Sequence, residues 1–150
     1  MERTLFVELG EYNVNYEWNI KENELRRLLI EEFCEYYAIE DYFRGEKLIN
    51  DYMLFGQVEE DFLDNVINNN IWELTNRFEG NVASEIYKLL RHIKKMSLTE
   101  IVKTLRGTKK YETLILDSRS DVFLMIEEMA EFNGYELVEE NETYTLKEAE

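Results

Sequence analysis

The sequence contains no proline, and its 150 residues include six glycines, one cysteine and one histidine. Since no stretch is rich in glycine, proline or repeated residues, the chain lacks the composition of a flexible linker, and we expect a compact fold. No long apolar run is present, and the residues after Met1 do not form a signal-peptide pattern. These absences predict a soluble protein of the cytoplasm, without membrane contact.

The single cysteine, Cys34, has no second thiol in the chain with which to form a disulfide. It stands among aromatic and acidic residues, where a thiol serves as a small hydrophobic side chain. Acidic neighbours raise the pKa of a thiol, which is the wrong direction for a nucleophile. We therefore predict a buried core cysteine without a catalytic role.

The hydrophobic content is that of a folded protein. Hydrophobic residues make up 45% of the chain and aromatic residues 13%, which excludes disorder through lack of core-forming side chains. The length predicts one domain, or a small domain with an appendage. The net charge of −16 repels nucleic acid and anionic membranes when averaged over the molecule.

Positive charge is concentrated in one part of this acidic chain. Residues 1–80 carry 19 acidic and 7 basic residues, and residues 111–150 carry 12 acidic and 2 basic residues. In residues 81–110, which we call the basic segment, two acidic residues stand against eight basic ones. These eight, our candidate binding residues, are Lys88, Arg91, Lys94, Lys95, Lys103, Arg106, Lys109 and Lys110.

In the first half of the chain, alternating and helical patterns predict a β-hairpin followed by helices. Two strands, at residues 4–9 and 12–18, are expected to join through a turn at Gly10. Helices are expected at residues 21–37, 39–55 and 57–78, the second broken near Gly45 and the third ended by Gly80. Asn68, Asn69 and Asn70 are weak helix formers that can split the third helix.

The second half begins with a helix from Asn81 or Ser84 to about residue 95. Ser97 and Glu100 then have the spacing of a capping box, which starts a short helix at residues 98–105. A strand at 111–116, a helix at 122–132 with Phe132 inward, and a hairpin of strands 135–138 and 143–146 complete the chain. The fold class is α+β: an N-terminal β-hairpin with several helices, then a C-terminal α-β-α-β-β two-layer sandwich.

This organisation predicts an acidic region, residues 1–80, and a second region, residues 81–150, in which the basic segment leads into the α/β unit. A single compact domain is the alternative.

The C-terminal third resembles the TusA/SirA-like sulfur-carrier domains. The resemblance rests on the strand-like residues Tyr111-Glu112-Thr113-Leu114-Ile115-Leu116, and on Asn133-Gly134-Tyr135-Glu136-Leu137-Val138 at a spacing close to that of the family. It implies a two-layer α/β sandwich. Where the family carries its nucleophilic cysteine, this chain has Met96-Ser97-Leu98-Thr99. The resemblance therefore implies the fold of a sulfur carrier without its activity.

Other candidate sites have simpler explanations. A winged-helix reading of the basic segment needs a basic recognition helix, but helix 122–132 carries Glu127, Glu128 and Glu131 on its outer face. His92 has no partners for a catalytic triad, and Asp61 with Asp64 lacks further ligands for a metal ion. The aromatic residues of strand 12–18, with Tyr36-Tyr37 and Tyr42-Phe43, form a core or else line a binding groove.

We expect a non-enzymatic interaction or regulatory module that binds a protein partner through charged surfaces, the partner being another protein or a second copy in a homodimer. A nucleic-acid-associated regulator acting through residues 81–110 is the first alternative. An enzyme, or a degenerate sulfur-carrier-like protein, is the second. No catalytic residue, metal ion or cofactor is predicted.

Overall fold

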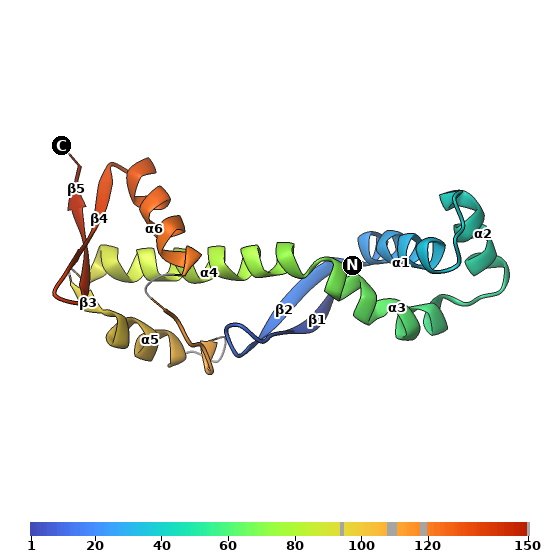
Figure 1. Ribbon diagram of the computed structural model, residues 1–150, viewed down its shortest axis with the longest axis horizontal. Coiled ribbons are helices and arrows are strands. Elements are labelled where there is room, and N and C mark those ends of the chain that lie inside the picture. The colour runs from blue at the N-terminus through green and yellow to red at the C-terminus, as the bar shows by residue number, and fades with distance from the viewer. Residues whose placement is uncertain (94, 108–110, 118–119, 150) are drawn as a thin grey trace. The chain divides into compact units, whose positions relative to one another are not determined.

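The computed structural model describes residues 1–93, 95–107, 111–117 and 120–149. Its α+β fold combines helices with two small antiparallel sheets (Figure 1). The strands are β1 (Glu2–Leu9), β2 (Val14–Lys21), β3 (Met96–Ser97), β4 (Tyr135–Glu140) and β5 (Thr143–Glu148). The helices are α1 (Glu22–Tyr36), α2 (Tyr42–Asp51), α3 (Phe55–Asn69), α4 (Ile71–His92), α5 (Leu98–Arg106) and α6 (Asp121–Phe132).

The chain divides into two compact units. The first unit comprises Met1–Val7 and Glu17–Leu74, and the second comprises Glu8–Tyr16 and Thr75–Glu150. The hairpin and α4 each contribute residues to both units. Residue 80, where the sequence suggests a boundary, lies inside α4.

The N-terminal hairpin confirms the alternating pattern of the sequence. Every second side chain of β2 is buried, from Val14 to Ile20, while those between are exposed. The turn spans residues 10–13 and includes Gly10, as expected. The residue with a left-handed backbone is Asn13, with φ of 54°, a conformation that asparagine tolerates better than most residues.

In the first unit, α1 packs against α2 and α3. Cys34 is buried, as predicted, and burial is the largest cause of its raised thiol pKa. Gly45 does not break α2 but lies buried within it, directly against Cys34. A glycine allows this close approach of the two helices because it has no Cβ. Phe33 of α1 and Phe62 of α3 add an edge-on ring contact at 6.2 Å between centroids.

The expected helix end at Gly80 is wrong, because α4 runs on to His92. The break comes earlier, at Asn70 between α3 and α4, where the Asn70 side-chain amide donates a hydrogen bond to the Val66 carbonyl at 2.7 Å. Across Gly80 the buried positions Phe78, Val82 and Ile86 keep helical spacing. Burial of this apolar stripe outweighs the cost of about 1 kcal/mol for glycine inside a helix.

The second unit contains a sheet of order β3-β5-β4. β4 and β5 form the expected hairpin, with Leu137 opposite Leu146, and α6 packs on β4. β3 pairs with the start of β5, through Met96 opposite Tyr144. In the view of Figure 1, α5 and α6 lie on opposite sides of the part of α4 that belongs to this unit.

Two expectations for this unit are wrong. Residues 111–116 form no strand: Tyr111 lies in a short helical turn, and residues 114–117 are without regular secondary structure. The edge of β5 that could have received another strand pairs with Met96–Ser97 instead. Phe132, expected to point inward, is 91% exposed at the last position of α6, where the helix extends beyond its buried stripe.

The close contact between Gly45 and Cys34 can be tested by substitution. In Gly45→Ala the new methyl group overlaps the Sγ atom of Cys34, and such overpacking costs about 1–3 kcal/mol, more than the roughly 1 kcal/mol that alanine gains in a helix. We expect a lower free energy of unfolding in urea titrations, with the loss removed in Gly45→Ala/Cys34→Ala. Gly56→Ala is the control, because its methyl group meets no atom within 4 Å; equal effects at Gly45 and Gly56 would contradict the contact.

Candidate functional site

Of the eight candidate basic residues, the structure describes five: two have internal partners, two lie at a groove and one is exposed. Lys88 on α4 lies 3.8 Å from Glu85. The Arg91 guanidinium stacks on the ring of Tyr135, 4.4 Å from its centroid. Lys95 is exposed. Lys103 and Arg106 lie on α5 and line a groove. The remaining three, Lys94, Lys109 and Lys110, lie outside the described residues.

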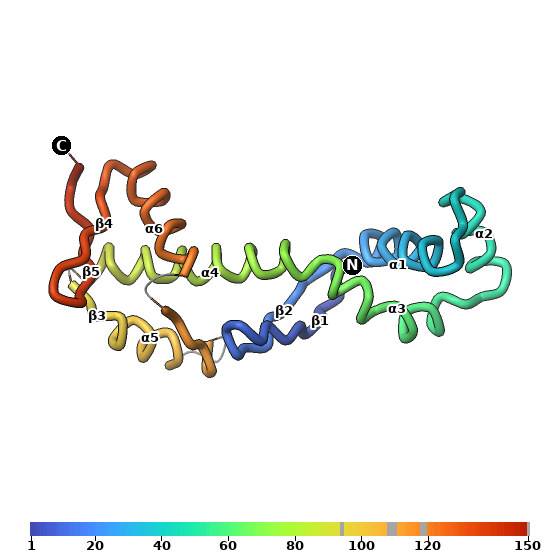
Figure 2. The backbone as a smooth tube through the Cα atoms, viewed as in Figure 1, coloured from blue at the N-terminus to red at the C-terminus, as the bar shows by residue number. Residues whose placement is uncertain are grey.

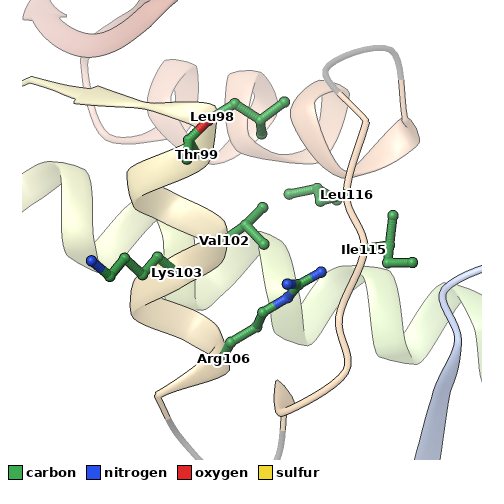
Figure 3. A pocket seen from close by; sticks show the side chains of 7 residues that line it. All are labelled: Leu98, Thr99, Val102, Lys103, Arg106, Ile115 and Leu116. Carbon is green, nitrogen blue, oxygen red and sulfur yellow. The ribbon is translucent and has the colours of Figure 1, made fainter.

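The groove lies between α5 and residues 114–116, two parts of the chain that run side by side (Figures 2 and 3). We call it the α5 groove. Its volume is about 480 Å³. The lining residues are Leu98, Thr99, Val102, Lys103, Arg106, Ile115 and Leu116. It therefore combines an apolar surface with two basic side chains.

Helix α5 directs its side chains to the groove through local sequence signals. Its start is the predicted capping box: the Ser97 hydroxyl accepts a hydrogen bond from the Glu100 backbone N–H, and the Glu100 carboxylate accepts one from the Ser97 N–H, both at 3.2 Å. Ile101 and Leu105 are buried in the unit. The neighbouring stripe of Leu98, Val102 and Arg106, spaced four residues apart, faces the groove.

The opposite wall is held in place by contacts at both ends. The buried ring of Tyr111 lies 6.1 Å from that of Phe78. Leu114 and Leu116 point inward, whereas Ile115 between them is 53% exposed. The Arg106 Nε–H reaches across from α5 and donates a hydrogen bond to the Leu114 carbonyl at 2.7 Å. In Figure 3 the Arg106 side chain spans this gap, and Leu116 points toward Val102.

Charge is available at one end of the groove. Among the residues that the structure describes, neither Lys103 nor the two terminal amino groups of Arg106 form an ion pair or hydrogen bond. At the other end, Leu98 and Thr99 also line a second hollow of about 390 Å³, which contains Glu139 and Glu142. The groove is therefore basic at one end and adjoins an acidic hollow at the other, an asymmetry that favours one direction of a charged ligand.

A second notable feature, which the sequence analysis missed, is the buried carboxyl group of Glu79. It is 5% exposed and accepts a hydrogen bond from the Tyr12 hydroxyl. Once α4 is seen as one helix, Glu79 lies three residues before Val82 and four before Ala83, on the apolar stripe. An acidic residue on the apolar stripe of a helix is the sequence signal that could have identified Glu79 as a buried carboxyl group.

Burial raises the pKa of Glu79 above its ordinary value. The Tyr12 hydrogen bond opposes this shift, and the nearby charges of Asp121 and Glu11 add to it. Burial likewise raises the pKa of Tyr12, helped by Glu79 itself. The rings of Tyr12 and Phe78 meet here at 5.0 Å. This carboxyl is buried and bonded to a core tyrosine, and we assign it a structural role.

The other candidates from the sequence lie partly in the core and partly at the surface. Tyr12, Tyr16 and Trp18 are buried, so the aromatic face of the hairpin belongs to the core, whereas Tyr36 and Phe43 are 69% and 75% exposed. Within the described residues, no three His, Cys, Asp or Glu side chains gather as metal ligands. In that same part of the chain, no helix has the length and apolarity needed to cross a membrane.

The first unit contains a hollow of about 380 Å³. It is of less interest, because both of its arginines already have partners: Arg3 pairs with Glu59, and Arg26 stacks on Phe55 at 3.9 Å. The α5 groove is the candidate site.

No protein-family model matches this chain, and comparisons with curated proteins and with solved structures find no similar protein. The resemblance to sulfur-carrier domains therefore stays a prediction. The strand that it implies at residues 111–116 is not formed.

The buried carboxyl of Glu79 predicts a specific pH dependence of stability. Because its folded pKa is raised, its contribution to stability is fully present below the unfolded pKa of about 4.5 and is lost as the pH rises through the folded value. Glu79→Gln keeps an oxygen that accepts the Tyr12 hydrogen bond and removes the charge. We expect this variant to unfold at higher urea concentration than the wild type at neutral pH.

The advantage of Glu79→Gln should shrink as the pH falls toward 4.5, the ordinary value for the group. Glu128→Gln removes the same charge from an exposed position of α6, and such surface substitutions change stability by less than about 0.5 kcal/mol. A Glu79→Gln variant that is less stable than the wild type at neutral pH would contradict the cost of the buried charge.

Proposed function

We propose that the protein is a non-enzymatic interaction module, and that the α5 groove binds an acidic, partly apolar segment of another protein. The observation that carries the proposal is the composition of the groove. Leu98, Val102 and Ile115 offer apolar surface for burial, and Lys103 and Arg106 offer positive charge beside it. A ligand must carry both apolar and acidic groups to use both parts of this surface.

Arginine and lysine have different parts in this recognition. The Arg106 Nε–H is already bonded to Leu114 at 2.7 Å, which orients the guanidinium and leaves its two terminal amino groups for a carboxylate. Lys103 is a flexible point charge on the neighbouring stripe of the helix. In Figure 3 its side chain extends away from residues 115–116, so it supplies attraction along the outer side of α5.

The alternatives have less support. Nucleic-acid binding would draw on the whole basic segment, but Arg91 stacks on Tyr135 and Lys88 lies near Glu85. The groove is also lined mainly by apolar side chains, whereas nucleic-acid interfaces are strongly polar and basic. A homodimer must bring together two chains that each carry a charge of −16, which repel each other. An enzyme needs converging catalytic groups, and among the described residues that line the groove the usual acids, bases and nucleophiles are represented by Thr99 and Lys103 alone.

Binding can be measured with a fluorescent peptide in which valine alternates with glutamate. We expect fluorescence anisotropy to show binding to the full-length protein that weakens as salt is added. Lys103→Glu should weaken binding by about tenfold, equivalent to about 1.4 kcal/mol. Lys103 is exposed, so the substitution should leave the fold intact, which circular dichroism checks.

Lys88→Glu is the matched control, because it makes the same charge change in the basic segment outside the groove. It should leave peptide affinity almost unchanged, and a peptide that alternates valine with lysine should not bind. Equal losses in Lys88→Glu and Lys103→Glu, or a salt-sensitive gel shift with nucleic acid, would overturn the proposal in favour of the nucleic-acid alternative. A dimer in light scattering that dissociates with salt would replace the acidic partner with a second copy of the chain.

A further inference from the structure

Residues 114–117 have the character of a strand without a strand partner. The side chains alternate: Leu114 is fully buried, Ile115 is 53% exposed and Leu116 is 7% exposed, which is the period of a β-strand. Ile115 is β-branched, which also favours strand formation. Figure 3 shows the chain running nearly straight past Ile115 and Leu116.

On each edge of this segment, only some of the backbone N–H and C=O groups form hydrogen bonds. The Ile115 N–H donates to the Tyr12 carbonyl at 3.4 Å, a long hydrogen bond on one edge. The Leu114 carbonyl accepts from Arg106, which extends from α5 and lines the groove. No hydrogen bond joins either backbone group of Leu116 to another of the described residues.

In an extended chain, backbone groups of alternate residues point to the same edge. Since the Leu114 carbonyl points toward Arg106 and the groove, the N–H and C=O of Leu116 belong to that edge as well. Leu116 itself lines the groove. On this edge, the N–H and the C=O of Leu116, a residue that is 7% exposed, are one donor and one acceptor that no described residue occupies.

We propose that the acidic segment binds as an added β-strand, paired with residues 114–117 along the α5 groove. This inference rests on the proposed function and adds its binding mode. One ligand residue exchanges two hydrogen bonds with the backbone of Leu116, as in an antiparallel pair. Apolar side chains of the ligand pack on Val102 and Leu98, and a carboxylate near the Leu114 end meets the terminal amino groups of Arg106.

The charges around the α5 groove and the backbone groups of Leu116 indicate which kind of ligand binds there. Main-chain hydrogen bonds contribute affinity to any extended peptide, whereas Arg106 favours a carboxylate beside it, and Glu139 and Glu142 in the adjoining hollow repel one. Together these charges select one direction for an acidic ligand. An amphipathic helix would present no backbone groups to Leu116. A nucleic acid would lack the paired N–H and C=O groups of a strand.

The test uses two versions of the valine–glutamate peptide, each with one N-methylated amide at neighbouring central positions. N-methylation removes a hydrogen-bond donor, and in a strand adjacent amides point to opposite edges. One of the two peptides should therefore lose affinity by at least about tenfold, and the other should bind like the unmodified peptide. In parallel, binding of the unmodified peptide should slow hydrogen exchange at the Leu116 amide.

The outcomes separate the two proposals. If the unmodified peptide binds in a Lys103-dependent manner, but both N-methylated peptides bind equally well and the Leu116 amide exchanges as in the free protein, strand addition is overturned while the proposed function stands. If the unmodified peptide does not bind, the proposed function fails and the binding mode fails with it. Protection at Leu116 that is lost in Lys103→Glu would support both.

Discussion

The ring of Phe78 is the contact on which the second unit depends. It meets the rings of Tyr12, Tyr16 and Tyr111, with centroids 5.0, 5.8 and 6.1 Å away. Aromatic rings bury large areas and prefer such tilted and edge-on contacts. One side chain of α4 thereby joins the hairpin tip to the chain that follows α5. Because Tyr111 is anchored there, residues 114–116 run beside α5 and the groove forms.

The same part of α4 accounts for the buried carboxyl of Glu79 and for the different surroundings of the basic residues. Glu79 follows Phe78 in the helix and accepts a hydrogen bond from the Tyr12 hydroxyl. The buried carboxyl therefore has a hydrogen-bond partner, although burial raises its pKa. Lys88 and Arg91 extend from the same helix to Glu85 and Tyr135. Arg106 combines both roles: its Nε–H fastens the groove wall, and its remaining amino groups are available to a ligand.

Signals that depend on near neighbours in the chain predict the local structure that forms. Ser97 with Glu100 starts α5, Asn133 caps α6 before Gly134 with φ of 80°, and the two hairpins form where the patterns alternate. A capping box or a turn is determined by three or four consecutive residues. Gly80 was misread because the helical pattern on each side of it looked like two helices. Lys103 and Arg106 were candidates on charge alone, but nothing local distinguished them from Lys88.

By itself, the sequence determined the α+β class, the concentration of positive charge in residues 81–110 and the burial of Cys34. Tertiary structure decided whether residues 111–116 became a strand. A helix satisfies its backbone within one segment, whereas a strand needs a neighbour, and β5 pairs with Met96 and Ser97 instead. Leu114, Ile115 and Leu116 therefore keep the alternating burial of a strand without joining a sheet, and this segment forms one wall of the groove.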